Sequence, residues 1–375
     1  MTADNSHIDI NDDLALMNRA FDLAAQGNLT THPNPRVGCV IVNDGEIVGE
    51  GYHLKAGDLH AERLALQQAG DRARGGTAYV NLEPCCHQGR TPPCTDGLID
   101  AGISRVVAAM HDPNPLVYGG GFEQLKNAGI DVQTGVLEEQ ATWLNRGFIN
   151  RMKNNKPWVI LKSAATLDGR TADFDGESKW ITGDIARDQV QRLRARSSAV
   201  ITGIGTVLAD NPSLNVRLEG AVRQPLRVVL DSQLRLPLDA KIIGDDENLV
   251  VFTVSNDIEK ISALTELGVE VIRQENQEIN LSEVLTELVK WSCNEILVEA
   301  GQTLSGAFLE SGLVDELVLF YAGTLLGDKG KSMFQFGSPL SFANRVDYSV
   351  RNVEMVGNDF KVSAVNQQSL ENLSG

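Results

Sequence analysis

Side chains that could hold a metal ion recur in one part of the sequence. His60 is followed two positions later by Glu62, and Cys85 and Cys94 come further along the chain. One imidazole and two thiolates form a three-ligand set for zinc that leaves a fourth position open for water. A carboxylate beside such a water can take its proton and pass it to a leaving group. The pattern therefore predicts a hydrolytic zinc site, with His60, Cys85 and Cys94 as ligands and Glu62 as the proton carrier.

A closed, structural zinc site is the alternative interpretation of these residues. Such a site needs a fourth protein ligand, for which Cys86 and His87 are the candidates. Cys86 adjoins Cys85, and adjacent residues in an extended segment point in opposite directions. The sequence therefore favours the open, catalytic arrangement.

The spacing of the two cysteines narrows the type of chemistry. An H-x-E sequence followed by P-C and a second cysteine is typical of zinc-dependent nucleobase deaminases. Here eight residues separate Cys85 from Cys94, and the second cysteine ends the sequence T-P-P-C. This longer loop resembles the deaminase half of the bacterial riboflavin-pathway deaminase/reductase family. The resemblance implies an N-terminal α/β/α domain like that of cytidine deaminase, although Cys86 stands where a small polar residue is expected.

Length and composition indicate two domains without a membrane span. A chain of 375 residues is longer than one hydrophobic core usually serves. No apolar run reaches the roughly eighteen residues that a membrane helix needs. The first residues, M-T-A-D-N, lack the apolar segment of an export signal. An odd number of cysteines, 5, predicts free thiols in a reducing cytoplasm rather than disulfides.

The net charge of −17 restricts the class of ligand. Binding to a nucleic-acid backbone requires a basic surface, so the acidic balance disfavours a zinc-stabilised module that binds nucleic acid. A single phosphorylated metabolite needs only a few local arginines. The charge therefore favours a small-molecule substrate, with no nucleic acid and no membrane as partner, and a homo-oligomer is compatible with it.

Alternating strand and helix patterns predict an α/β domain over residues 1–150. A first helix is expected at 12–25, with Asp12 as its cap and Gly27 as its stop. Further helices are expected at 60–73 and 94–101, strands at 77–82 and 104–110, and a hairpin through Asp44-Gly45. Pro84 suits the first turn of a further helix. Glycines 119–121 precede a short helix, which is compatible with a plain turn or with a loop that holds phosphate.

The polar, basic segment 150–157 ends in proline and predicts the boundary to a second domain over residues 151–375. Strands are expected at 158–163, 226–231, 249–254, 269–272, 295–298 and 317–322, helices at 184–196 and 281–291, and a terminal hairpin from 346–355 and 360–365. Residues 199–217 are expected to form a strand, a glycine loop and a polar loop. The tail after Asn366 is expected to be loose.

The start of this second domain resembles the reductase half of the same family, whose fold is like that of dihydrofolate reductase. The resemblance rests on the sequences A-A-T-L-D-G-R at 164–170 and G-E-S-K-W-I-T at 176–182, and it extends over residues 12–365. It implies deamination of a phosphorylated aminopyrimidine followed by NADPH-dependent reduction of its ribosyl group. A deaminase for another pyrimidine or purine is the nearer alternative.

The resemblance also implies the residues of each site. In the first domain Asn34, His53, His87 and Arg90 would hold the substrate; without the resemblance, His53 is an ordinary polar residue. In the second domain the residues implied for NADPH are Ala164, Trp180, Thr206, Asp210, Ser232 and the turn Gly301, Gln302, Thr303, Leu304, Ser305, Gly306 and Ala307. Those implied for the substrate are Lys162, Ser178, Arg194, Leu214, Arg217 and Glu299, with the two arginines at its phosphate. None of them is an obvious acid or base, so positioning is expected to dominate the reduction.

Overall fold

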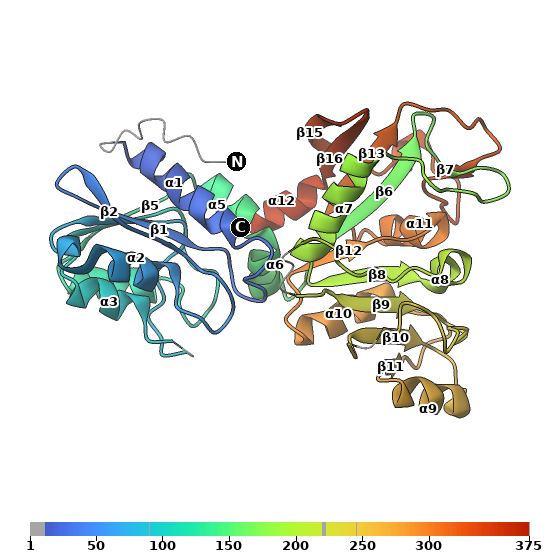
Figure 1. Cartoon of the computed structure of the whole chain (residues 1–375), viewed down its shortest axis with the longest axis horizontal. Helices are drawn as coiled ribbons and strands as arrows, with labels where there is room; N and C mark the ends of the chain where they lie inside the picture. Colours follow the sequence, from blue (N-terminus) through green and yellow to red (C-terminus); the bar gives the residue numbers. More distant parts are fainter. Residues whose placement is uncertain (1–11, 90, 220–222, 245, 375) are drawn as a thin grey trace. The chain divides into compact units, whose positions relative to one another are not determined.

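The computed structural model describes residues 12–89, 91–219, 223–244 and 246–374. The chain divides into two compact units, Met1–Asn154 and Asn155–Gly375 (Figure 1). Both are mixed α/β structures, as the sequence predicts. The division falls inside the polar segment 150–157, while the exact domain limits 1–150 and 151–375 stay a prediction.

The sheet of the first unit has the strand order β2-β1-β3-β4-β5. Its strands are β1 (Gly38–Asn43), β2 (Glu46–Tyr52), β3 (Thr77–Val80), β4 (Arg105–Ala108) and β5 (Asp131–Thr134). The β1–β2 hairpin turns at Asp44 and Gly45 as predicted, and β3, β4 and β5 are parallel. Parallel strands end at the same edge of a sheet, so the segments that follow β3 and β4 emerge side by side.

Helices cover both faces of this sheet. They are α1 (Asp13–Gln26), α2 (Ala61–Ala69), α3 (Cys94–Asp100), α4 (Gly120–Asn127), α5 (Glu138–Leu144) and α6 (Arg146–Asn154), and a 3₁₀ turn (Gly70–Ala73) extends α2. The Asp12 side chain caps α1 through the Leu14 amide, and Gly27 ends the helix, as the sequence predicts. A core that includes Cys39, Ile41 and Ala65 joins α2 to the sheet. This packing fixes the start of α2, where the metal-binding motif begins.

Pro84 does not begin a helix, so that prediction is wrong. The segment after β3 stays non-helical until α3 begins at Cys94. The reason is that the Cys85 carbonyl accepts hydrogen bonds from the amide and the hydroxyl of Thr95, at 3.2 and 3.3 Å. A carbonyl used in this way is lost to a helical turn, and the backbone around Cys85 stays open.

The second unit contains a sheet of order β11-β10-β9-β8-β12-β6-β13-β16-β15. Its strands are β6 (Trp158–Thr166), β8 (Ala199–Gly203), β9 (Leu226–Leu230), β10 (Leu249–Thr253), β11 (Glu270–Arg273), β12 (Glu295–Val298), β13 (Glu316–Ala322), β15 (Ser349–Val356) and β16 (Asp359–Val365). The strands from β11 to β13 are parallel, and β16 and β15 add the predicted antiparallel hairpin. Short strands β7 (Arg170–Ala172) and β14 (Lys331–Ser332) pair separately.

The helices of the second unit are α7 (Asp184–Arg196), α8 (Ile204–Asp210), α9 (Ile258–Glu266), α10 (Leu281–Lys290), α11 (Gln302–Glu310) and α12 (Gln367–Ser374), with a 3₁₀ turn at Phe342–Asn344. α7 and α10 lie where the sequence predicts helices. Residues 204–210 were expected as a glycine loop but form α8, because Ile204 and Val207 are buried one turn apart. The helix then ends at Asn211 in the left-handed conformation.

The ends of the two units also differ from expectation. The tail after Asn366 is not loose but forms α12, because Ser369 donates a hydrogen bond to the half-buried Asp315, at 2.7 Å. Residues 150–154, in the segment predicted as the domain boundary, form the last turn of α6, whose Phe148 and Ile149 are buried. Among the described helices, none combines the length and apolar composition required to span a membrane.

The contact between α2 and β2 leaves no room for a side chain at Gly51. An added Cβ would lie 2.4 Å from the Ala61 carbonyl oxygen and 2.7 Å from the Ala65 amide nitrogen. Gly51→Ala is therefore expected to lower the unfolding free energy of the first unit by about 1–3 kcal/mol, measured by urea unfolding. Gly323→Ala is the control, because its Cβ meets nothing within 4 Å. Equal unfolding curves for both variants would contradict this account.

Candidate functional site

Three separate segments of the first unit bring the predicted zinc ligands together. His60 caps the start of α2, Cys85 lies in the segment after β3, and Cys94 is the first residue of α3. Their ligand atoms all lie within 4.8 Å of one another, and they form a group suited to a metal ion among the described residues. Cys86 is outside this group, because its sulfur points to the carbonyls of Leu116 and Val117. The described structure therefore favours the open site.

The distances within this group fit a tetrahedral ion. The Nδ1 atom of His60 lies 3.5 Å from the Cys85 sulfur and 3.3 Å from the Cys94 sulfur. Zinc bound at ordinary Zn–N and Zn–S lengths places such ligand atoms roughly 3.5 Å apart. Donation from Cys94 lowers the pKa of Cys85, which favours the thiolate form that metals bind. The donor set and its spacing thus fit zinc.

Thr91 is a part of the site that the motif did not reveal. Its hydroxyl lies 3.2 Å from Nε2 of His60. Metal binding through Nδ1 leaves the proton on Nε2, which then donates to Thr91 and holds the ring in place. Its position three residues before Cys94, in the loop that closes on the metal, is the signal that could have identified it.

Glu62 lies in the first turn of α2 with only 4% of its surface exposed. Its Oε2 atom is buried and has no hydrogen-bond partner. Burial raises the pKa of this carboxyl group, and the charge of Cys85 acts in the same direction. A buried carboxylate with one unpartnered oxygen beside a metal group is suited to exchanging a proton with a bound molecule.

His53 and Asn34 form a second pair at this site. The Asn34 amide lies 2.9 Å from Nε2 of His53, and Nδ1 of His53 lies 3.1 Å from the Leu59 carbonyl. The carbonyl can only accept, so Nδ1 carries the proton and Nε2 accepts from Asn34. Burial lowers the pKa of His53, which keeps the ring neutral. The structure thus brings together two residues that are far apart in the sequence.

These residues line one cavity of about 450 Å³, within the usual range for small-molecule sites. The lining includes Asn34, His53, His60, Glu62, Cys85, His87, Asp112, Asn114 and Arg151. Nδ1 of His87 is buried without a partner, so this ring can accept a ligand contact. Arg90 lies outside the described residues.

The carboxylate of Glu83 organises the wall of this cavity. It accepts hydrogen bonds from the amides of Asp112, Gly119, Gly121 and Phe122, at 2.9 to 3.2 Å. The glycines at 119–121 therefore surround a carboxylate of the chain itself rather than a phosphate. An added Cβ at Gly121 would lie 2.1 Å from the Pro84 carbonyl oxygen, which explains why glycine is needed there.

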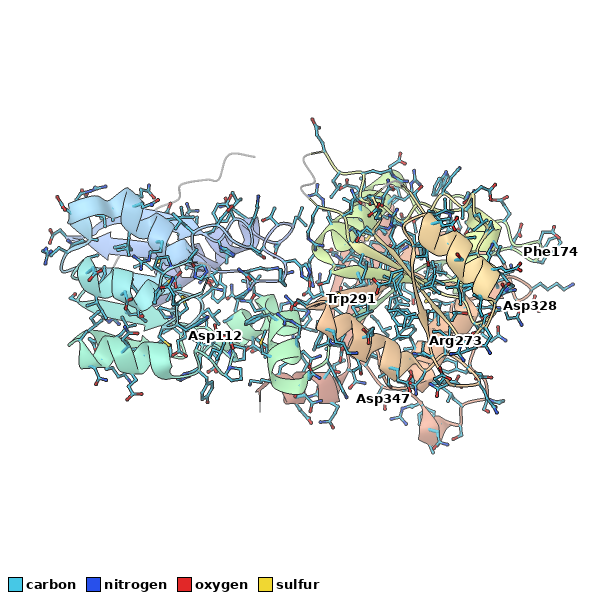
Figure 2. The ribbon with its side chains drawn as sticks, turned by 90° about the horizontal axis from the view of Figure 1, so that it is seen from below. Asp112, Phe174, Arg273, Trp291, Asp328 and Asp347 are labelled. Atoms are coloured by element: carbon cyan, nitrogen blue, oxygen red, sulfur yellow. The ribbon has the colours of Figure 1, made fainter. Side chains whose placement is uncertain are left out.

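Asp112 and Asn114 were also missed in the sequence. Burial raises the pKa of Asp112 to about 7, and Figure 2 shows its position in the first unit. Its carboxylate accepts a hydrogen bond from the Asn114 amide at 2.8 Å. Both residues follow β4 at the carboxyl edge of the parallel strands, where ligand sites of α/β sheets usually lie. That position in the sequence is the signal that could have revealed them.

In the second unit, two helix starts meet at the edge of adjacent strands. α8 follows β8 and α11 follows β12, and these two strands are parallel neighbours. A Cβ at Gly301 would lie 3.9 Å from the Thr206 hydroxyl, and one at Gly203 would lie 3.3 Å from Leu304. The first amides of a helix have no acceptor within the helix, so the start of α11 beside Thr206 is suited to an anion.

The remaining residues predicted for NADPH differ in exposure. Gly301, Thr303, Asp210 and Ser232 are exposed, and Gln302, Leu304, Ala307 and Ala164 are partly buried. Ser305 and Gly306 instead face the interior, where a Cβ on Gly306 would meet the Gln335 carbonyl at 1.8 Å. Trp180 is 69% exposed on the segment that also carries Phe174, which projects outward in Figure 2.

A buried charged cluster lies beside these helix starts. Glu299 follows β12, and its carboxylate accepts two hydrogen bonds from Arg194, at 2.6 and 3.0 Å. Lys162 from the adjacent β6 lies 3.9 Å from the same carboxylate. Burial opposes the charge of Glu299, yet Arg194 and then Lys162 hold its pKa below the ordinary value. Arg194 and Lys162, two of the residues predicted for the substrate, thus neutralise the charge of a third, Glu299.

Arg217 differs from Arg194 in its surroundings. Arg217 is exposed and near enough to lower the pKa of Glu299, whereas Arg194 is largely buried and engaged by that residue. Leu214 is 4% exposed, and Ser178 is partly buried. The structure therefore places an exposed guanidinium next to the neutralised cluster, where an anionic group can approach.

Two family models match the two parts of the chain. Residues 10–110 match the cytidine and deoxycytidylate deaminase zinc-binding region. Residues 157–362 match the RibD C-terminal domain, which is more than half of the chain. The first match contains all three residues of the proposed metal group.

Similar proteins match along almost the whole chain. The riboflavin biosynthesis protein RibD of Haemophilus influenzae is 46% identical over 94% of this chain and 96% of its own. RibD from Escherichia coli is 46% identical over 92% and 96%. The solved structure of Acinetobacter baumannii RibD has a TM-score of 0.88 at 45% identity, covering 96% of this chain and 100% of that one. The chain therefore belongs to the RibD family of riboflavin biosynthesis, in which a zinc-dependent deaminase domain precedes an NADPH-dependent reductase domain.

Proposed function

We propose that the chain catalyses two consecutive reactions on one phosphorylated aminopyrimidine. The first is hydrolytic deamination of 2,5-diamino-6-ribosylamino-4(3H)-pyrimidinone 5′-phosphate, and the second is NADPH-dependent reduction of its ribosyl group to ribityl. The observation that carries the deamination is the buried, unpartnered oxygen of Glu62 beside the three-residue metal group. A Thermotoga maritima relative, 38% identical with a TM-score of 0.85, covers 94% of this chain and 98% of its own. It is described as a diaminohydroxyphosphoribosylaminopyrimidine deaminase and 5-amino-6-(5-phosphoribosylamino)uracil reductase.

Residues 1–150 are proposed as the deaminase and residues 151–375 as the reductase. In the deaminase, His60, Cys85 and Cys94 would hold the zinc, which would supply an activated water. Glu62 takes a proton from this water and delivers it to the departing ammonia. Asn34 and His53 orient the pyrimidine ring, and the proposal includes His87 and Arg90 as further substrate contacts.

In the reductase, bound NADPH would supply a hydride to C1′ of the ribosyl group. The amides at the start of α11 would hold its diphosphate, assisted by Thr206. Further cofactor contacts are proposed for Ala164, Trp180, Asp210, Ser232 and the residues from Gly301 to Ala307. Lys162, Ser178, Arg194, Leu214, Arg217 and Glu299 are proposed to hold the substrate. These groups act by placing the two reactants together rather than by proton transfer.

The direct test is incubation of the purified protein with the diaminopyrimidinone ribotide, with and without NADPH. Mass spectrometry is expected to detect the aminouracil ribotide without NADPH and the ribityl product with it. Recovery of unchanged ribotide under both conditions would refute the proposed substrate.

A reducing, cytoplasmic setting is part of this proposal. The cysteines Cys39, Cys85, Cys86, Cys94 and Cys293 are all free thiols. A site that depends on two thiolates requires that they stay reduced, and the cytoplasm maintains that state. These observations support the proposed location.

A homo-oligomer is also proposed. The strand β15 lies at the end of its sheet order, and its Val350, Val353 and Met355 are 59–71% exposed. An exposed apolar edge strand favours association with another chain. A second copy of this chain is the occupant that we propose.

Zinc content should depend on the two cysteine ligands. Cys85→Ser and Cys94→Ser replace a thiolate by a hydroxyl, so both variants are expected to lose zinc and deaminase activity together. Metal analysis of the purified proteins measures the loss. Cys86→Ser is the matched control and should keep about one zinc per chain; zinc loss in that variant alone would support the closed site instead.

Glu62→Gln should separate metal binding from proton transfer. The amide has nearly the same shape but cannot carry the proton, so the deamination rate is expected to fall by about two to four orders of magnitude. Zinc content and the NADPH-dependent step should stay at their wild-type levels. Steady-state kinetics together with metal analysis check this, and near-normal deamination would remove the role of Glu62.

Arg217→Ala should weaken substrate binding in the reductase. Loss of one charged hydrogen-bonded contact to phosphate is expected to raise the reductase KM for the ribotide by about ten- to a hundredfold. Arg192→Ala is the control, because Arg192 is exposed on α7 and pairs with Asp188. An equal rise in the KM for NADPH would assign Arg217 to the cofactor, and an unchanged KM would leave it a surface residue.

A further inference from the structure

The cavity of the deaminase unit is lined by several acidic residues, although its proposed substrate carries a negatively charged phosphate. Asp58, Glu62, Glu83 and Asp112 are among its lining residues. Among its described lining residues, the only lysine or arginine is Arg151. A ribotide carries a phosphate dianion, which such an acidic wall repels unless a cation is close. Among the described lining residues, the cavity therefore points to Arg151 as the cation that can meet the phosphate.

Arg151 lies on α6, next to the lining residues Phe148 and Met152. It is half-buried, and its guanidinium carbon lies 5.9 Å from the centre of the Phe148 ring. One of its nitrogens lies 3.5 Å from the carbonyl oxygen of Pro33, the residue before Asn34. The guanidinium is thus held beside the loop that presents Asn34 to the cavity.

We propose that Arg151 binds the 5′-phosphate of the ribotide in the deaminase site. This assignment rests on the proposed function, because it takes the phosphorylated aminopyrimidine as the substrate. The pyrimidine then lies at the metal group with Asn34 and His53, and the ribose phosphate extends along the cavity toward α6. A guanidinium presents several N–H donors in one plane, which matches the oxygens of a phosphate. Arg151 acts in binding, not in the chemical step.

The test compares the ribotide with its dephosphorylated riboside as deaminase substrates, without NADPH. Arg151→Ala is expected to raise the KM for the ribotide by about ten- to a hundredfold while changing the KM for the riboside less than about twofold. Arg151→Gln keeps a polar side chain of similar length and should show the same selective loss. Zinc content should equal that of the wild type in both variants.

Lys153→Ala is the matched control. Lys153 is exposed two residues further along α6, so its loss removes the same charge without touching the cavity lining. Its KM for the ribotide should stay at the wild-type value. An equal rise of the ribotide KM in the Lys153 variant would show that general charge attraction, rather than a contact with Arg151, explains the effect.

Other results of this experiment would contradict the role of Arg151. Equal rises of the ribotide and riboside KM in the Arg151 variants would show that this side chain shapes the cavity. Unchanged KM values would remove it from the site. Either result overturns the proposal. Arg151→Gln serves for this decision if Arg151→Ala does not fold. Failure of the wild type to deaminate the ribotide would instead refute the proposed function, and the Arg151 assignment with it.

Discussion

The buried carboxylate of Glu83 connects the parts of the deaminase unit that must stay in register. It follows β3, and its oxygens accept amide hydrogen bonds from the segment after β4 and from the start of α4. An isolated buried carboxylate is costly, but one that accepts several amides is stabilised. The positions of Cys85, two residues later, and of Asp112 therefore depend on the same group. The metal site and the cavity wall are joined through it.

The reductase unit also depends on one carboxylate, which is paired here with cationic side chains. Glu299 is buried at the end of β12, between Arg194 from α7 and Lys162 from β6. The free-energy cost of removing these charges from water is offset here only because the partners are close and Arg194 is hydrogen-bonded to Glu299. Each unit therefore fixes one carboxylate at the carboxyl ends of parallel strands, the region where α/β sheets bind ligands. The helix starts and the exposed Arg217 lie around this fixed point.

The sequence predicted the parts of the molecule that depend on local chemistry. The H-x-E pattern and the two cysteines predicted the group that the structure brings together, and Asp12 and Gly27 correctly marked both ends of α1. Contacts between distant segments decided the rest. Pro84 does not start a helix because Thr95 takes the Cys85 carbonyl, and residues after Asn366 form a helix because Ser369 reaches Asp315. Such partners cannot be read from neighbouring residues.

The same limit explains why Arg151 was missed while Arg194 and Arg217 were not. A family resemblance transfers residues that carry a recognised motif, but Arg151 stands in a polar segment that the sequence predicted only as a domain boundary. Only the folding of that segment into α6 places the guanidinium at the cavity. A chain with a net charge of −17 cannot attract a phosphate dianion by its overall field, so local cations must do so at each site. Since both reactions use a substrate with the same phosphate, each unit needs local cations, and we propose Arg151 for one unit and Arg217 for the other.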